Sequence, residues 1–292
     1  MSEPADVWIL SVPARTPAEA ETLSAWLENA CDASPVEMEM VDQALIWLEA
    51  YFEDETSAKL MLYAFKDTHP KVEAQVRHCG AKDWTTFWRH HFTPIKIGTS
   101  LFILPEWLRD HTHIPEGREV ILINPGLSFG TGSHFTTHFC LEMIDRLHAE
   151  GFKPETMLDA GCGSAILSIA ARKFGWSHIL AVDVDAMALD QAAENLVLNG
   201  IEDGITLEVK DLTRTWFDQK YPLLAANLYG GLLMELAPKL VRACSGTMIL
   251  SGIRTIEADA VATIFGQLGA VENVCEADQE WCGMLLDCSG CT

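Results

Sequence analysis

The fold of this chain is decided by a short segment, residues 157–166, which reads MLDAGCGSAI. A run of strand character leads into two glycines, and an apolar segment with helical spacing follows. Gly161 and Gly163 let the backbone turn sharply and approach a ligand, while the first amide groups of the following helix face it. A strand, a glycine turn and a helix in this order are typical of a parallel α/β sheet, in which ligands bind at the carboxyl ends of the strands.

From about residue 120 onward, strands alternate with helices. Apolar runs of strand length are separated by amphipathic segments of helical length. This alternation predicts a doubly wound, Rossmann-like α/β sheet. We expect strands at 157–160, 179–182, 206–209, 223–226, 247–251 and 281–287, and helices at 165–174, 187–199, 231–242 and 256–268.

The N-terminal part of the chain has a different pattern. Within residues 7–77, the segments follow the order β-α-β-β-α-β, which is that of a ferredoxin-like α+β sandwich. Expected strands lie at 7–12, 36–40, 44–51 and 72–77, and expected helices begin at residue 16 and cover 54–65. Residues 83–115 combine a helical segment with short strands that prolines and a glycine interrupt. We therefore predict three parts, which are a ferredoxin-like domain at 1–82, a connector at 83–118 and an α/β domain at 119–292.

The chain is strongly acidic, with a formal net charge of −22 over 292 residues, and neither half of it is basic. A protein that neutralises phosphate groups needs a surface of lysine and arginine, so direct binding of nucleic acid is not expected. An acidic surface attracts a basic protein partner, although the same charge can serve solubility alone. Composition therefore raises a basic protein as the expected partner.

No segment indicates a membrane or export. No apolar run approaches the roughly 18–20 residues that a membrane span requires, and residues 1–6 contain no lysine or arginine of the kind that opens a secretory signal. The 9 cysteines are scattered and odd in number, which favours reduced thiols over a disulfide framework. We expect a cytoplasmic protein without membrane contact.

No metal site is expected either. Cys288 and Cys291 have the spacing of a ligand pair, but no second pair accompanies them. His134 and His138 lie four residues apart, as in a helical metal pair, but no acid lies between them. We interpret His134 as a loop or cap residue and the cysteine pair as part of a frayed tail.

An acid at a defined distance indicates the class of ligand. Asp183 follows Gly161 by 22 residues and ends the second strand, where a carboxylate can accept both ribose hydroxyls of an adenosine ligand. A dinucleotide fingerprint requires a third glycine at position 166, where this chain has Ile166. S-adenosylmethionine has no pyrophosphate and carries an ammonium group, which Asp159 is placed to hold. These features favour S-adenosylmethionine as the cofactor over a dinucleotide, and a purely structural turn is the remaining alternative.

Three further residues lie at the ends of predicted strands and belong to the same cleft. Asp211 follows the third strand, where an acid can accept from the adenine amino group or form a solvated turn. Asn227 ends the fourth strand, where its side-chain oxygen can accept from an incoming amine or the side chain can stabilise a turn. Tyr229 follows closely and is placed to shape the channel for the acceptor.

Residues 124–138 read NPGLSFGTGSHFTTH, a glycine-rich loop that enters a helix. Its core, P-G-L-x-F-G-T-G-x-H-x-T-T, resembles the bacterial ribosomal protein L11 methyltransferase (PrmA) family. The resemblance covers about residues 83–292. Further segments that carry it are 83–84, 91–94, 158–164, 183–185, 227 and 280–282.

The resemblance implies both a fold and an activity. It implies a seven-stranded Rossmann-like methyltransferase domain, preceded by a small ferredoxin-like domain that recognises the substrate and a flexible connector. It also implies methylation of lysine side-chain and N-terminal amines, with S-adenosylmethionine as cofactor. Carried over residue by residue, the cofactor contacts fall on Thr137, Gly161, Asp183 and Asn227, with Phe129 and Thr131 nearby.

The chain departs from the family pattern at three places near this site. Ala165 stands where the family usually has glycine, Phe135 replaces a proline, and residues 227–230, NLYG, replace an N-I-L-A-like segment. These departures keep two alternatives open, a methyltransferase for another protein or small molecule and a protein that binds S-adenosylmethionine without catalysis. A nucleotide-dependent dehydrogenase is a further alternative, motivated by the glycine turn and Asp183 alone.

Our principal prediction is an amine methyltransferase. The sulfonium makes the methyl group a good electrophile, so the enzyme mainly aligns a neutral amine for in-line displacement. A lysine ammonium, with a reference pKa of about 10.4, must first lose its proton, and a largely apolar channel favours that loss by desolvation. We predict that Asn227 orients the amine and that Tyr229 shapes the channel.

Overall fold

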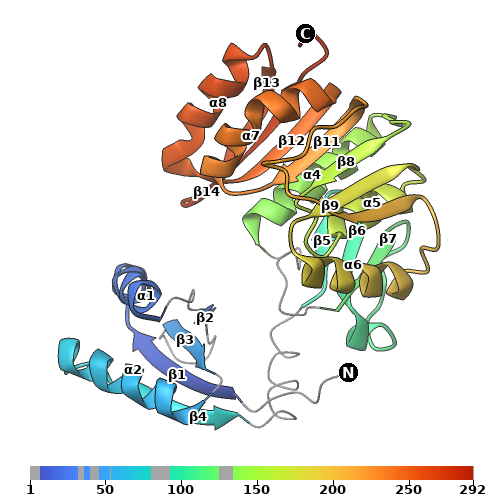
Figure 1. Cartoon of the computed structure of the whole chain (residues 1–292). Helices are drawn as coiled ribbons and strands as arrows, with labels where there is room; N and C mark the ends of the chain where they lie inside the picture. Colours follow the sequence, from blue (N-terminus) through green and yellow to red (C-terminus); the bar gives the residue numbers. More distant parts are fainter. Residues whose placement is uncertain are drawn as a thin grey trace. The chain divides into compact units, whose positions relative to one another are not determined.

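The computed structural model describes residues 7–31, 36–39, 46–52, 54–79, 93–124 and 134–291. The chain divides into two compact units, Met1–Phe92 and Thr93–Thr292. Figure 1 shows each unit with its own sheet and helices. The division falls inside the segment expected to be a connector, and the three-part scheme predicted from the sequence stays a prediction.

The first unit is a four-stranded antiparallel sheet with two helices, in the order β-α-β-β-α-β. Its sheet order is β2-β3-β1-β4, which is the arrangement of the predicted ferredoxin-like sandwich. Leu10, Val12 and Leu48 alternate toward the helices and pack against Leu27 and Phe65. The elements are β1 Val7–Ala14, α1 Pro17–Cys31, β2 Val36–Glu39, β3 Ile46–Phe52, α2 Glu55–Thr68 and β4 Gln75–Cys79.

The second unit is built on a seven-stranded sheet, as expected for a Rossmann-like domain. Its order is β10-β9-β8-β11-β12-β14-β13, with β14 antiparallel to both of its neighbours. The strands are β8 Met157–Ala160, β9 Ile179–Asp183, β10 Ile205–Val209, β11 Tyr221–Asn227, β12 Cys244–Arg254, β13 Val271–Ala277 and β14 Trp281–Asp287.

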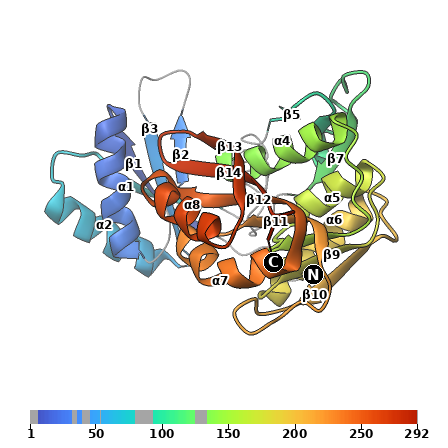
Figure 2. The ribbon, with the colours of Figure 1, turned by 90° about the horizontal axis from the view of Figure 1, so that it is seen from above.

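Helices cover both faces of this sheet (Figures 1 and 2). One face carries a core that includes α4 and α5, with α6 beside α5, and the other carries a core built on α7 and α8. Both faces of the central strands are therefore buried, as parallel sheets require. The helices are α4 Phe135–Ala149, α5 Ile166–Lys173, α6 Ala186–Leu198, α7 Gly230–Ala243 and α8 Ala258–Gln267, with a short 3-10 turn, η2 Thr255–Glu257, before α8.

Residues 95–123 form a small three-stranded sheet that belongs to the second unit. The strands are β5 Ile95–Ile97, β6 Leu101–Pro105 and β7 Glu119–Ile123, and the 3-10 helix η1 Glu106–Leu108 follows β6. Asp145 of α4 accepts hydrogen bonds from the backbone N–H groups of Thr99 and Ser100, both at 2.8 Å. This buried carboxylate therefore ties the turn between β5 and β6 to α4.

The sequence did not predict β13. Its side chains are almost all exposed, and they include Glu272 and Glu276. An edge strand with charged residues carries no apolar alternation from which it can be recognised. The full length of α4 was not predicted either, since only its entry near residue 138 was expected.

Within the part of the chain that the structure describes, no helix has both the length and the apolar character needed to cross a bilayer. The predicted tail at Cys288 and Cys291 is packed rather than frayed. Cys288 is 1% exposed and belongs to the core of α7 and α8.

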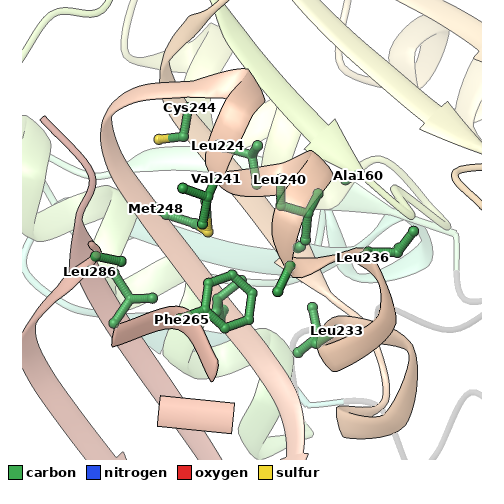
Figure 3. Packing of buried hydrophobic residues seen from close by; sticks show 14 of the residues in the cluster. Ala160, Leu224, Leu233, Leu236, Leu240, Val241, Cys244, Met248, Phe265 and Leu286 are labelled. Atoms are coloured by element: carbon green, nitrogen blue, oxygen red, sulfur yellow. The ribbon is translucent and has the colours of Figure 1, made fainter. Parts of the chain in front are cut away.

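Replacing Phe265 should test that core directly. Figure 3 shows Phe265 among Leu233, Met248 and Leu286, and its side chain is fully buried. Phe265→Ala is expected to lower the free energy of unfolding of the second unit by about 3–5 kcal/mol, because it removes a large apolar side chain and leaves a cavity. Urea titration measures this loss. Val271→Ala, at a 61% exposed position on β13, is the matched control and should change stability by less than about 0.5 kcal/mol; equal losses in both variants would contradict the assignment.

Candidate functional site

A cavity of about 600 Å³ opens at the carboxyl ends of the parallel strands. Gly161 follows β8, Asp183 ends β9, Asp211 follows β10 and Asn227 ends β11, and all four residues line this cavity. Parallel strands bring their carboxyl ends to one edge of the sheet, so residues separated by more than sixty positions meet here.

The glycine turn is held in a conformation that side chains oppose. Gly161 and Gly163 have φ angles of +76° and +49°. The N–H groups of Gly161 and Cys162 both donate to the carbonyl of Val182, at 2.8 and 2.9 Å. A Cβ at position 161 would collide with the side chain of Leu228. Glycine at 161 is thus favoured by the left-handed backbone, and a side chain there would also displace the end of the Leu228 side chain.

Ala165, which ends the turn, has φ +60° and ψ +23° and is fully buried. This left-handed conformation costs a non-glycine residue about 1–2 kcal/mol. The glycine that the family usually has at this position is therefore explained by the backbone. This chain keeps the same turn with an alanine.

The carboxylate of Asp183 is fixed by two backbone donors. The N–H of Gly163 donates to Oδ2 at 2.9 Å, and the N–H of Asp185 donates to Oδ1 at 3.0 Å. Each oxygen keeps a lone pair that can accept from a further donor. A carboxylate fixed beside the glycine turn fits the two adjacent hydroxyls of a ribose.

Asp159 lies in the core next to the cavity rather than on its wall. It is 1% exposed, and its Oδ2 accepts from the hydroxyl and the N–H of Ser168 at 2.6 and 3.2 Å. Its Oδ1 is buried and has no hydrogen-bond partner among the described residues. Burial raises the pKa of Asp159 to about 6. A carboxylate oxygen with no donor fits the ammonium group of S-adenosylmethionine, which would supply the opposite charge and reach it through water or by a direct hydrogen bond.

Asp211 lines the cavity from a turn that organises its carboxylate. The hydroxyl and N–H of Thr213 donate to its Oδ1 at 2.6 and 2.9 Å. These hydrogen bonds lower the pKa of Asp211 and keep it ionised. An ionised acid at this place can accept from an exocyclic amino group, although it also forms the turn that was the alternative interpretation.

The acceptor side of the cavity joins polar and aromatic side chains. The side-chain nitrogen of Asn227 donates to the hydroxyl of Thr137 at 3.4 Å, which leaves the side-chain oxygen as its acceptor. Tyr229 is 67% exposed and lies directly before α7, at its N-cap position. Leu228 and Trp281 complete this wall.

His134 caps α4, as predicted. Its Nδ1 accepts from the N–H of Thr136 at 3.4 Å, and its ring meets that of Trp281 edge-on at 5.1 Å. Burial lowers the pKa of His134, while the charges of Glu280 and Asp278 oppose that shift. His138 pairs with Glu142 at 3.3 Å, and no cluster of three or more potential metal ligands is found among the described residues.

The structure brings most of the predicted site residues to one cavity. Those that line it are Thr137, Gly161, Gly163, Asp183, Asp211, Asn227 and Tyr229. Asp159 does not line it, and Phe129 and Thr131 lie outside the described residues. The sequence did not predict Gly252 as a cavity residue. Gly252 lies within β12 with φ +80°, and a Cβ there would meet the backbone of Leu228. The available signal was a glycine directly after the strand predicted at 247–251.

Fold and cavity together define the class of protein. A seven-stranded sheet with one antiparallel strand, whose first glycine turn and second acid border one cavity, is that of a Rossmann-like methyltransferase. The model of the family described as ribosomal protein L11 methyltransferase (PrmA) matches residues 12–288, and the chain belongs to this family. This assignment confirms the predicted S-adenosylmethionine-dependent methyltransferase and its cofactor, and it decides against the dehydrogenase alternative.

Individual relatives agree with the family model. The ribosomal protein L11 methyltransferase of Photorhabdus laumondii is 38% identical over 204 residues, which are 69% of this chain and 66% of that protein. That of Enterobacter sp. (strain 638) is 35% identical over 242 residues, which are 79% of this chain and 78% of that protein. The crystal structure of the ribosomal protein L11 methylase from Lactobacillus delbrueckii subsp. bulgaricus has a TM-score of 0.60 and 31% identity, and the match covers 67% of this chain and 98% of that one.

Asp159→Asn should separate stability from donor binding. A folded-state pKa of about 6 against an ordinary 3.8 means that ionised Asp159 opposes folding above about pH 6. The variant removes that charge, so it should stabilise the unliganded protein at pH 7 by up to about 3 kcal/mol, since one pKa unit corresponds to about 1.4 kcal/mol. The gain should shrink between pH 6 and pH 4, where wild-type Asp159 becomes protonated in the folded state.

Thermal unfolding at pH 5, 6, 7 and 8 measures the stability change, and calorimetry with S-adenosylhomocysteine measures binding. The variant should bind at least tenfold more weakly, because it loses an ion pair with the ammonium group. Asp145→Asn is a comparison at another buried carboxylate. It would disturb the hydrogen bonds from two backbone N–H groups, so it should lower the free energy of unfolding. A destabilised Asp159→Asn protein with unchanged ligand binding would refute both roles.

Proposed function

We propose that this enzyme transfers methyl groups from S-adenosylmethionine to amines of ribosomal protein L11, namely lysine side chains and the N-terminal amine. The observation that carries the proposal is the cavity in which the glycine turn, Asp183 and Asn227 meet. Relatives at 35–38% identity are named ribosomal protein L11 methyltransferase, and the match to the family model spans both units of the chain.

The methyl donor would be bound by the residues predicted from the sequence. Asp183 would accept from the ribose hydroxyls, Asp211 from the adenine amino group and Asp159 from the ammonium group. Thr137 would contact the methionine end, and Phe129 and Thr131 belong to the same set by resemblance. A cavity of about 600 Å³ has room for this ligand and for an incoming side chain.

The bound donor supplies an electrophilic methyl group. What the protein must do is deliver a neutral amine in line with it and keep water away. The apolar side chain of Leu228 disfavours a charged ammonium at the wall that it forms. No side chain is assigned as the base, and the proton that the ammonium loses passes to solvent water. The side-chain oxygen of Asn227 would then orient the amine.

Charge supports a basic protein as the acceptor. The chain carries −22 formal charges. Near the cavity, Glu257 lies beside Gly230, and the negative charges of Asp278 and Glu280 raise the pKa of His134 against the effect of burial. Such a surface attracts a lysine-rich protein and repels nucleic acid. The ferredoxin-like unit would serve substrate recognition, and the cytoplasmic location predicted from the sequence belongs to the same proposal.

The direct test is to incubate the enzyme with isotopically labelled donor and purified, unmodified ribosomal protein L11. We expect the label on that protein, with mass increments of one methyl group mapped to lysine or N-terminal amines. Asp183→Ala should weaken binding of S-adenosylhomocysteine in calorimetry at least tenfold, since it removes hydrogen bonds to a charged group. Asp190→Ala, at an exposed position of α6, is the matched control and should behave as wild type.

Two outcomes count against the proposal in different ways. Wild-type affinity in Asp183→Ala would show that the donor binds elsewhere. Donor binding without transfer to ribosomal protein L11, but with transfer to another component of a lysate, would leave the site in place and replace the acceptor.

A further inference from the structure

The segment between β10 and β11, residues 210–220, differs from the other connections near the cavity. A helix follows β8, β9 and β11, but none forms within residues 210–220, all of which are described. Four consecutive residues of this segment, 210–213, nevertheless line the cavity. Within the segment, the N–H groups of Arg214 and Thr215 donate to the carbonyl of Asp211 at 3.1 and 2.9 Å and close a single turn. Contacts from outside are needed to fix the place of that turn relative to the rest of the domain.

Lys239 of α7 provides such a contact. Its Nζ donates to the carbonyl of Leu212 at 3.1 Å and to the carbonyl of Thr213. The same Nζ lies 5.1 Å from the ring centre of Trp216. One ammonium group on a rigid helix therefore connects three residues of the segment, through two charge-assisted hydrogen bonds and a cation–π contact.

The two carbonyls that Lys239 binds lie in the turn that carries Asp211. Thr213 donates to the carboxylate of Asp211 through its hydroxyl and N–H, so fixing the Thr213 carbonyl fixes the donor of that carboxylate. The start of the segment is fixed to the end of β9, because the N–H of Lys210 donates to the carbonyl of Asp183 at 2.8 Å. Lys239 is thus the contact from α7 that sets the far end of this wall.

Arg242 offers a natural comparison on the same helix. Its guanidinium lies 5.4 Å from the ring centre of Trp216, the same ring that Lys239 contacts. Among the described residues, Arg242 makes no hydrogen bond with the carbonyls of the segment, whereas Lys239 does. A substitution of Arg242 therefore disturbs the aromatic contact alone.

We propose that Lys239 is a positioning residue that holds residues 211–213 in place against the purine of the donor, and that it thereby sets the preference for a 6-amino over a 6-oxo purine. This inference rests on the proposed function, since it takes the wall of residues 210–213 as the purine side of the donor site. Asp211 accepts hydrogen bonds and cannot donate while it is ionised. It therefore favours an amino group over a carbonyl group only while its position is held.

The test compares Lys239→Met, Lys239→Arg and Arg242→Gln with wild type. Calorimetry measures dissociation constants for S-adenosylhomocysteine and S-inosylhomocysteine, and hydrogen–deuterium exchange follows residues 211–217 of the unliganded protein. In Lys239→Met we expect affinity for the adenosyl ligand to fall about tenfold and affinity for the inosyl ligand to fall less, so that the ratio between them drops at least threefold. Amide exchange in residues 211–217 should rise.

Lys239→Arg should keep most of the preference, because a guanidinium can also donate to two carbonyls. Arg242→Gln should keep the wild-type ratio and exchange rates. An unchanged ratio together with unchanged exchange in a folded Lys239→Met protein would overturn the inference. If that variant does not fold, Lys239→Gln takes its place under the same criteria.

Failure of the proposed function has a different signature. Wild-type protein that binds neither nucleoside ligand would refute the donor site itself. Wild-type protein that prefers the adenosyl ligand, with the same preference in the Lys239 variants, would refute only the positioning role.

Discussion

The constraint on which the site depends is the junction between the ends of β8 and β9. The carbonyl of Val182 accepts two successive amides of the glycine turn, and the side chain of Asp183, one residue later, accepts the N–H of Gly163. Three hydrogen bonds thus fix the turn against the neighbouring strand. The backbone reaches this geometry by taking positive φ angles at two glycines.

A carboxylate whose burial costs free energy lies beside the same junction. Asp159 lies in β8, one residue before the strand ends at Ala160, and the sheet around it excludes water. Ser168 compensates one of its oxygens, while the other finds no donor among the described residues. An unpaired buried carboxylate is destabilising unless a ligand supplies the missing partner. A carboxylate that opposes folding in the free protein and stabilises the complex is therefore consistent with a binding role.

Sequence reasoning succeeded where a pattern has a local cause. The strands at 157–160 and 281–287 were predicted with their observed bounds, because strands inside a covered sheet are mainly apolar. The edge strand β13 was missed, since its exposed charged residues carry no such pattern. The cavity residues at strand ends were predicted from topology alone. The contact of Lys239 with Leu212 could not be, because it joins residues 27 positions apart through tertiary packing.

The central claim is that one adenosyl ligand lies between the glycine turn and the carboxylate of Asp183. A crystal structure of the protein with S-adenosylhomocysteine tests this most directly. The expected result is a ribose bound to Asp183, a purine beside residues 211–213 and an amino group that contacts Asp159 directly or through one water. A ligand bound elsewhere, or one that leaves Asp183 without contact, would contradict the claim.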